Sequence, residues 1–147
     1  MQTDSPRAPV VNPSPPTATR LNLVAHRAGR AVLDGGWWPR SWDPAAELPG
    51  LVTDLSERYG PIRNVMLNNG VWGGRFRRLT VGARVVRMGW YASLDPALAI
   101  ATTEGGDQLD LLVVPPQTSE ADADSAMSRA ADPADTTRAP QLLVRPV

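Results

Sequence analysis

Cysteine is absent from this chain of 147 residues, and histidine occurs once. The absence of cysteine excludes disulfides, thiolate nucleophiles and thiolate metal ligands, and a single histidine leaves little for a transition-metal site. The sequence has no run of eighteen apolar residues, and its N-terminus lacks the apolar stretch of a secretion signal. We therefore expect a cytoplasmic protein without a membrane segment, and we assign it no metal and no cofactor.

Lysine is missing as well, so all fifteen basic residues are arginines, and fifteen acidic residues balance them. The charges are unevenly spread. Residues 20–91 hold eleven arginines against five carboxylates, whereas residues 92–147 hold nine carboxylates against three arginines. Such asymmetry indicates either an anionic partner or two halves that fold together and compensate each other. We favour the second interpretation.

The length allows one domain with a modest core. Residues 1–19 contain five prolines and almost no large apolar residues, so we expect a disordered N-terminal tail. Residues 20–133 carry the periodic apolar patterns and form the expected single α+β domain. Residues 134–147 form the expected flexible C-terminal tail.

Alternating apolar residues predict short strands separated by turn residues. The predicted strands span residues 21–24, 31–38, 62–67, 77–81, 83–91, 98–103 and 109–114. The last two are separated by a glycine-rich turn, which favours an antiparallel hairpin. The last strand is apolar on both faces, as is typical of a central strand. In the strand at 83–91, Val86, Met88 and Trp90 share one face, so Arg87 and Tyr91 point the other way.

Asp43 and Pro44 are typical of a helix start, and apolar residues at helical spacing predict a helix over residues 44–59. Pro49 has no amide to donate within that helix, so the helix is expected to bend there or to begin nearer Leu48.

A second helix is predicted over residues 118–132, where Ser119 and Asp122 resemble a capping box. Together the elements predict an α+β fold: an antiparallel sheet of about five or six strands with two helices. A partly closed barrel is the alternative architecture.

Three of the five tryptophans, Trp37, Trp38 and Trp42, stand within six consecutive residues. Neighbouring side chains of an extended strand point to opposite faces, so Trp37 and Trp38 are not expected to share one role. We expect one ring in the core and the other facing solvent, a loop or a ligand. The cluster is interpreted first as a structural hinge between the sheet and the first helix, and second as part of a binding surface.

The functional interpretation is an aromatic and arginine-rich surface that stacks bases or holds anionic groups. Its candidate residues are Trp37, Trp38, Arg40, Trp42, Trp72, Arg75, Arg77 and Arg78. No RNA-binding strand signature, helix-turn-helix pattern or zinc-finger spacing accompanies them. We favour a non-enzymatic binding or regulatory module whose partner is a protein or a small ligand rather than nucleic acid. Nucleic-acid binding through the arginine-rich half is the alternative, and a small enzyme of unknown class is the second.

Other motifs indicate little catalytic chemistry, and we assign no catalytic residue. The glycine-rich segment 68–74 follows a strand but lacks the ending of a phosphate-binding loop, so we interpret it as a turn. His26 has no nucleophile elbow to accompany it, and Asp107 and Asp110 flank a turn where carboxylates are usually solvated. A small enzyme would have to use Asp34, Asp107 or His26.

Three blocks of the sequence resemble a family of small actinobacterial proteins that is catalogued as a domain of unknown function. They are Leu33-Asp34-Gly35-Gly36-Trp37-Trp38-Pro39-Arg40-Ser41 with Ala46-Glu47-Leu48-Pro49, then residues 86–90, then Asp110-Leu111-Leu112-Val113-Val114-Pro115-Pro116. Together they span about residues 20–133. The resemblance implies no established activity, cofactor or partner, so it assigns a role to no residue.

Overall fold

The computed structural model describes residues 10–11, 19–24, 33–73, 75–132 and 139–143. His26 and most of the expected tails lie outside these residues. All predicted strands and both predicted helices are present, and a two-residue β1 and a four-residue α3 fall within the expected tail segments. The elements are β1 (Val10–Val11), β2 (Leu21–Leu23), β3 (Gly35–Trp37), α1 (Pro44–Tyr59), β4 (Ile62–Asn68), β5 (Arg78–Val81), β6 (Arg84–Tyr91), β7 (Leu98–Thr103), β8 (Gln108–Val113), α2 (Glu120–Ala130) and α3 (Ala139–Leu142).

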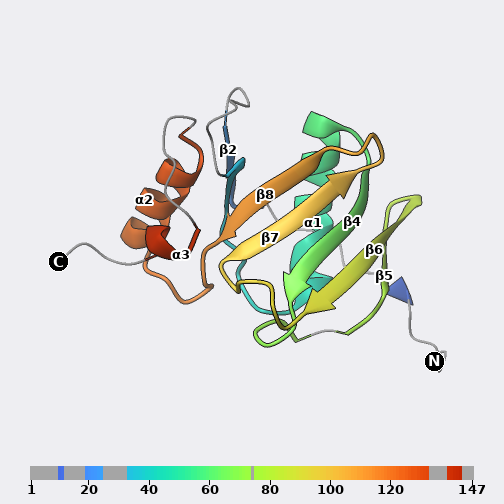
Figure 1. The fold of residues 1–147 in the computed structure, drawn as a ribbon, viewed down its shortest axis with the longest axis horizontal. Coiled ribbons are helices and arrows are strands. Elements are labelled where there is room, and N and C mark those ends of the chain that lie inside the picture. Colours follow the sequence, from blue (N-terminus) through green and yellow to red (C-terminus); the bar gives the residue numbers. More distant parts are fainter. Residues whose placement is uncertain (1–9, 12–18, 25–32, 74, 133–138, 144–147) are drawn as a thin grey trace.

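The strands form one mixed sheet in the order β1-β5-β6-β4-β7-β8-β3-β2 (Figure 1). Three neighbouring pairs are parallel: β1 with β5, β4 with β6, and β3 with β8. The sheet is open, with β1 and β2 at its edges, so the alternative barrel is not formed. The α+β class is confirmed. The prediction of five or six antiparallel strands is wrong, because seven strands of three or more residues join with the short β1 in a mixed sheet.

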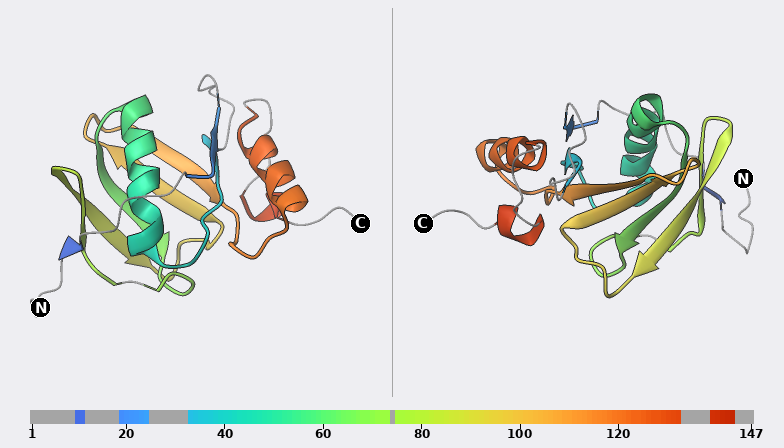
Figure 2. Two further views of the ribbon diagram at one scale, coloured as in Figure 1. Left: turned by 180° about the vertical axis from the view of Figure 1, so that it is seen from behind. Right: turned by 45° about the horizontal axis from the view of Figure 1, so that its top comes forward.

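Two chain paths produce two of the three parallel pairs, β4 with β6 and β3 with β8. After β4 the chain forms β5 on the far side of β6 and returns through a hairpin, so β6 runs in the direction of β4. Between β3 and β4 the chain crosses one face of the sheet as α1, and the β7–β8 hairpin occupies the space between these strands (Figure 2). That hairpin is antiparallel, as predicted.

Helix α1 begins after Asp43, whose carboxylate accepts a hydrogen bond from the Ala45 amide at 3.1 Å. The helix continues through Pro49 and ends at Gly60, where φ is +97°. Glycine tolerates this left-handed conformation, which an L side chain rarely adopts. The alternative start near Leu48 is not observed.

The main core lies between α1 and one face of the sheet (Figure 2). The apolar residues at helical spacing on α1 meet the alternating apolar residues of the strands there, and each buried side chain of this size contributes about 1.5–3 kcal/mol. Its residues include Leu48, Leu51 and Leu55 of α1, Val65 and Leu67 of β4, and Leu109, Leu111 and Val113 of β8.

A second core lies on the opposite face, where α2 packs against β8 and β3. Leu112 and Val114 face this helix, so β8 is buried on both faces, as predicted. A Cβ built on Gly36 would lie 3.1 Å from the Met127 Cα atom. The glycine therefore permits the close approach of α2 to β3.

The second core covers only one end of that face. On the side away from α1, no described helix lies over β5, β6 or β4 (Figures 1 and 2). We call the outward side of β5, β6, β4 and β7 the open face. None of the described helices has the length and apolar character needed to span a membrane.

Candidate functional site

The tryptophan cluster is built into the main core. The Trp37 and Trp72 rings are stacked, with centroids 5.4 Å apart, and the Trp42 ring meets Trp72 edge-on at 5.0 Å. Trp37 is 1% exposed and Trp72 is 2% exposed. These two rings therefore offer no face to a partner, and they fix the loop after β4 to the strand before α1.

Trp38 lies on the other side of β3, against the second core. Its Nε1 atom donates a hydrogen bond to the Pro115 carbonyl at 3.2 Å. The prediction that Trp37 and Trp38 face opposite ways is confirmed, because each ring packs in a different core.

The outer face of Trp38 is covered by a guanidinium. The Arg20 Cζ atom lies 3.6 Å from the ring centroid, and the same group donates to the carbonyls of Trp38 and Pro39 at 2.9 Å each. Burial lowers the pKa of Arg20, and the neighbouring charge of Arg40 lowers it further. The adjoining hollow, which Arg40 and Glu47 also line, has a volume of about 10 Å³, enough for about one water molecule.

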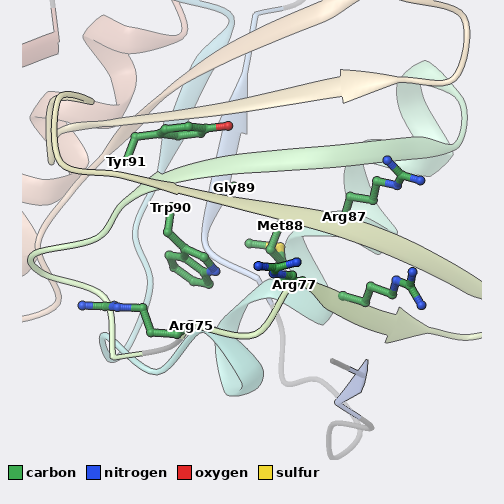
Figure 3. Close-up of a pocket in the computed structure, with 8 residues that line it drawn as sticks. Arg75, Arg77, Arg87, Met88, Gly89, Trp90 and Tyr91 are labelled. Carbon is green, nitrogen blue, oxygen red and sulfur yellow. The ribbon is translucent and has the colours of Figure 1, made fainter. Parts of the chain in front are cut away.

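A much larger pocket lies at the other end of the sheet, where β6 extends beyond β5 (Figure 3). Its volume is about 500 Å³. We call it the arginine pocket, because four of its eight lining residues are arginines. It is lined by Arg75, Arg77, Arg78, Arg87, Met88, Gly89, Trp90 and Tyr91.

The segment before β5 is fixed along the end of β6 by backbone contacts. The Met88 amide donates to the Arg77 carbonyl at 2.8 Å, and Trp90 Nε1 donates to the Phe76 carbonyl at 2.8 Å. Arg75 donates to the Asn69 carbonyl at 2.8 Å, which ties this segment to the turn after β4. The arginines therefore project from a constrained backbone.

The arginine pocket concentrates positive charge. Arg78 and Arg87 are direct partners across β5 and β6, an arrangement of like charges that destabilises a sheet. Among the residues that the structure describes, no carboxylate lines the pocket and none pairs with Arg77, Arg78 or Arg87. Arg84, the first residue of β6, does have a carboxylate partner, because its Nη1 atom lies 2.9 Å from Glu104 Oε2.

Tyr91 forms an aromatic wall on the outward side of the pocket. A Cβ built on Gly89 would lie 2.7 Å from Tyr91 Cε2, so the ring lies directly over that glycine (Figure 3). Tyr91 is 48% exposed, so the ring presents its opposite side outward. Gly89 thus holds open the space that the tyrosine ring occupies.

The eight predicted surface residues separate into three places. Arg75, Arg77 and Arg78 come together in the arginine pocket. The other five are elsewhere: Trp37, Trp42 and Trp72 belong to the main core, and Trp38 and Arg40 border the small hollow beside Glu47.

Five pocket residues are absent from the predicted surface: Arg87, Met88, Gly89, Trp90 and Tyr91. The strand alternation already indicated that Arg87 and Tyr91 point away from the core, and both are exposed. What the sequence did not indicate is that β5 places Arg78 beside Arg87.

The acidic and glycine-rich motifs singled out in the sequence lie in strand pairing and turns. The Asp34 carboxylate accepts a hydrogen bond from the Asp110 amide at 2.8 Å and joins β3 to β8. Asn68 Oδ1 accepts from the Gly70 amide at 2.6 Å, which forms the predicted turn. Asp107 lies in the exposed β7–β8 turn. His26 lies outside the described residues.

Comparison with known proteins gives a family. A model for a family of unknown function, DUF5994, matches residues 20–130, which include the main core, the arginine pocket and every buried residue of the second core except Ala139. Neither the curated proteins nor the solved structures yield a match.

Proposed function

The chain belongs to DUF5994, a family of unknown function, and from its own geometry we propose that it is a binding module that holds an anionic ligand in the arginine pocket. The observation that carries this proposal is the placement of four arginines around one cavity whose described lining residues include no carboxylate. Of the binding surface expected from the sequence, the proposal keeps Arg75, Arg77 and Arg78.

The charge arrangement supports an anion as ligand. Facing Arg78 and Arg87 repel each other in the free protein, and an anion between them relieves that repulsion. Guanidinium groups donate two parallel hydrogen bonds to phosphate or carboxylate, which lysine cannot do. An anion held by two or more arginines is therefore fixed in orientation as well as attracted.

The dimensions of the pocket also support a ligand of moderate size. A volume of about 500 Å³ lies within the usual range for small-molecule sites, about 300–1,000 Å³. Met88 and Trp90 add apolar surface to the arginines. The pocket thus suits a phosphorylated or carboxylated organic molecule better than a bare inorganic ion.

Inorganic pyrophosphate is a suitable probe, because its charge is compact and it carries no organic group. We expect it to bind in isothermal titration calorimetry at low salt. Arg77→Gln and Arg87→Gln should each weaken binding about tenfold, the effect of losing a hydrogen bond between charged groups. Arg84→Gln is the matched control, because this arginine lies on the same strand but pairs with Glu104.

The proposal fails if pyrophosphate does not bind at about 50 mM salt, where electrostatic binding is strong. It also fails if the variants at Arg77 and Arg87 bind as tightly as the Arg84→Gln control.

A further inference from the structure

We propose that the open face beside the arginine pocket binds a single strand of nucleic acid, with Tyr91 as the platform on which a base stacks. This inference rests on the proposed function, since the same arginines would hold the phosphates. It adds the chemical class of the ligand and a second group of contacts outside the pocket.

Tyr91 has the properties of a stacking platform. One side of the Tyr91 ring rests on the backbone of Gly89, which has no side chain to displace the ring. The other side is accessible, because the residue is 48% exposed. Aromatic rings that are exposed in this way on a sheet stack nucleobases of any sequence, because every base has a flat face.

The phosphate-binding groups lie next to this platform. Arg87 and Tyr91 are on the same side of β6, separated by Gly89. Arg78 is the cross-strand partner of Arg87 on β5. A strand whose base stacks on Tyr91 therefore has its backbone within reach of two guanidinium groups.

The open face continues across β4 and β7 with groups that suit unpaired bases. Met66 pairs in register with Gly89 on β6 and with Ile100 on β7, so partly exposed apolar side chains adjoin the tyrosine. Asn64 and Thr102 are likewise partners in register and add polar groups to the same face. Bases offer both flat apolar surfaces and hydrogen-bonding edges, and this face has partners for both.

The charges limit the path of such a strand. The outward positions of β5, β6, β4 and β7 contain no aspartate or glutamate, but the next strand places Asp110 opposite Ile100. A polyanion is therefore repelled from β8 and confined to the part of the sheet that no described helix covers. A duplex is disfavoured, because its base faces are already stacked internally and cannot reach Tyr91.

Fluorescence anisotropy with labelled oligo-dT of about twelve nucleotides tests the inference, since that length is within the range bound by single-strand sites on sheets. We expect the single strand to bind at least tenfold more tightly than its duplex with oligo-dA. Two arginine–phosphate contacts predict a slope of roughly −1.4 in a plot of log K against log salt.

Variants separate stacking from charge. Tyr91→Ala should weaken binding of the oligonucleotide about 5- to 100-fold, the usual effect of losing one stacked base. Gly89→Ala should act in the same direction, because its Cβ displaces the ring. Because pyrophosphate has no base to stack, each change should weaken its binding less than that of the oligonucleotide. Val85→Ala is the control, because Val85 is a 52% exposed apolar residue on the same side of β6 and outside the pocket.

Each outcome has a defined meaning. If pyrophosphate binds but the single strand binds no more tightly than the duplex, the inference is wrong and the proposed function stands. Insensitivity of oligonucleotide binding to Tyr91→Ala, or equal competition by an oligo-glutamate peptide, also overturns the inference. Failure of both pyrophosphate and oligonucleotide to bind overturns the proposed function with it.

Discussion

Replacement of Gly35 by alanine should destabilise this domain strongly, because β2 lies too close to accept a side chain there. Gly35 pairs with Leu23 across β3 and β2. A Cβ built on Gly35 would lie 2.3 Å from the Asn22 carbonyl oxygen and 2.9 Å from the Leu23 Cα atom. Both are backbone atoms, so the clash cannot be relieved by rotation of a side chain.

The size of the effect follows from the displacement that is needed. Carbon and carbonyl oxygen atoms of neighbouring strands approach to about 3.3 Å, so β2 must withdraw by about 1 Å. That movement lengthens the β2–β3 hydrogen bonds and loosens Leu21 and Leu23 against the main core. Overpacking of this kind costs about 1–3 kcal/mol, and the lower entropy of the unfolded chain offsets about 0.4–1 kcal/mol. With the weakened strand pairing added, we expect a net loss of about 2 kcal/mol.

Urea unfolding followed by tryptophan fluorescence measures this loss. With a slope of about 1–2 kcal/mol per molar urea, the midpoint should fall by about 1–2 M. Gly105→Ala is the matched control, because a Cβ there would meet only Thr103 Oγ1 at 3.8 Å. The control should remain within about 0.5 kcal/mol of the unsubstituted chain. Equal midpoints for Gly35→Ala and Gly105→Ala would refute the close-approach argument.

Three further substitutions test other contacts by the same unfolding assay. Asn68→Ala should cost about 2 kcal/mol, because the buried amide of Asn68 makes three hydrogen bonds to the backbone of two loops. Arg20→Lys should cost about 1–2 kcal/mol, because an ammonium cannot stack on Trp38 and keep both carbonyl bonds. Glu104→Gln should change stability by less than about 0.5 kcal/mol, since its ion pair with Arg84 is exposed; a larger loss would contradict the assignment of a surface pair.

The sequence predicted the elements well because their signals are local. Asp43 caps the start of α1, and Gly60 ends the helix with a positive φ. The alternation of apolar residues identified the seven longer strands. Strand direction was predicted wrongly, because nothing near β6 in the sequence specifies that it pairs with β4. The direction depends on strand order, which is not a local property of the sequence: β6 lies between β5 and β4, antiparallel to β5 and parallel to β4.

The candidate site was predicted in part for the same reason. The sequence grouped Arg75 and Arg77, which precede β5, with Arg78, the first residue of that strand. Arg87 and Tyr91 join these arginines only through the pairing of β5 with β6. The tryptophans were harder to assign, because burial depends on which elements meet. Trp72 is distant from Trp37 in the sequence, yet the two rings stack in the main core.

The position of the β7–β8 hairpin between β3 and β4 also has a consequence for biosynthesis. Strands β3 and β4 leave the ribosome before this hairpin, but each lacks one of its two neighbours until residues 98–113 have been made. Until then both strands expose unpaired edges, which are prone to join other chains. The nascent protein therefore completes its sheet late, and a pause in translation before residue 98 should expose it to aggregation or to capture by chaperones.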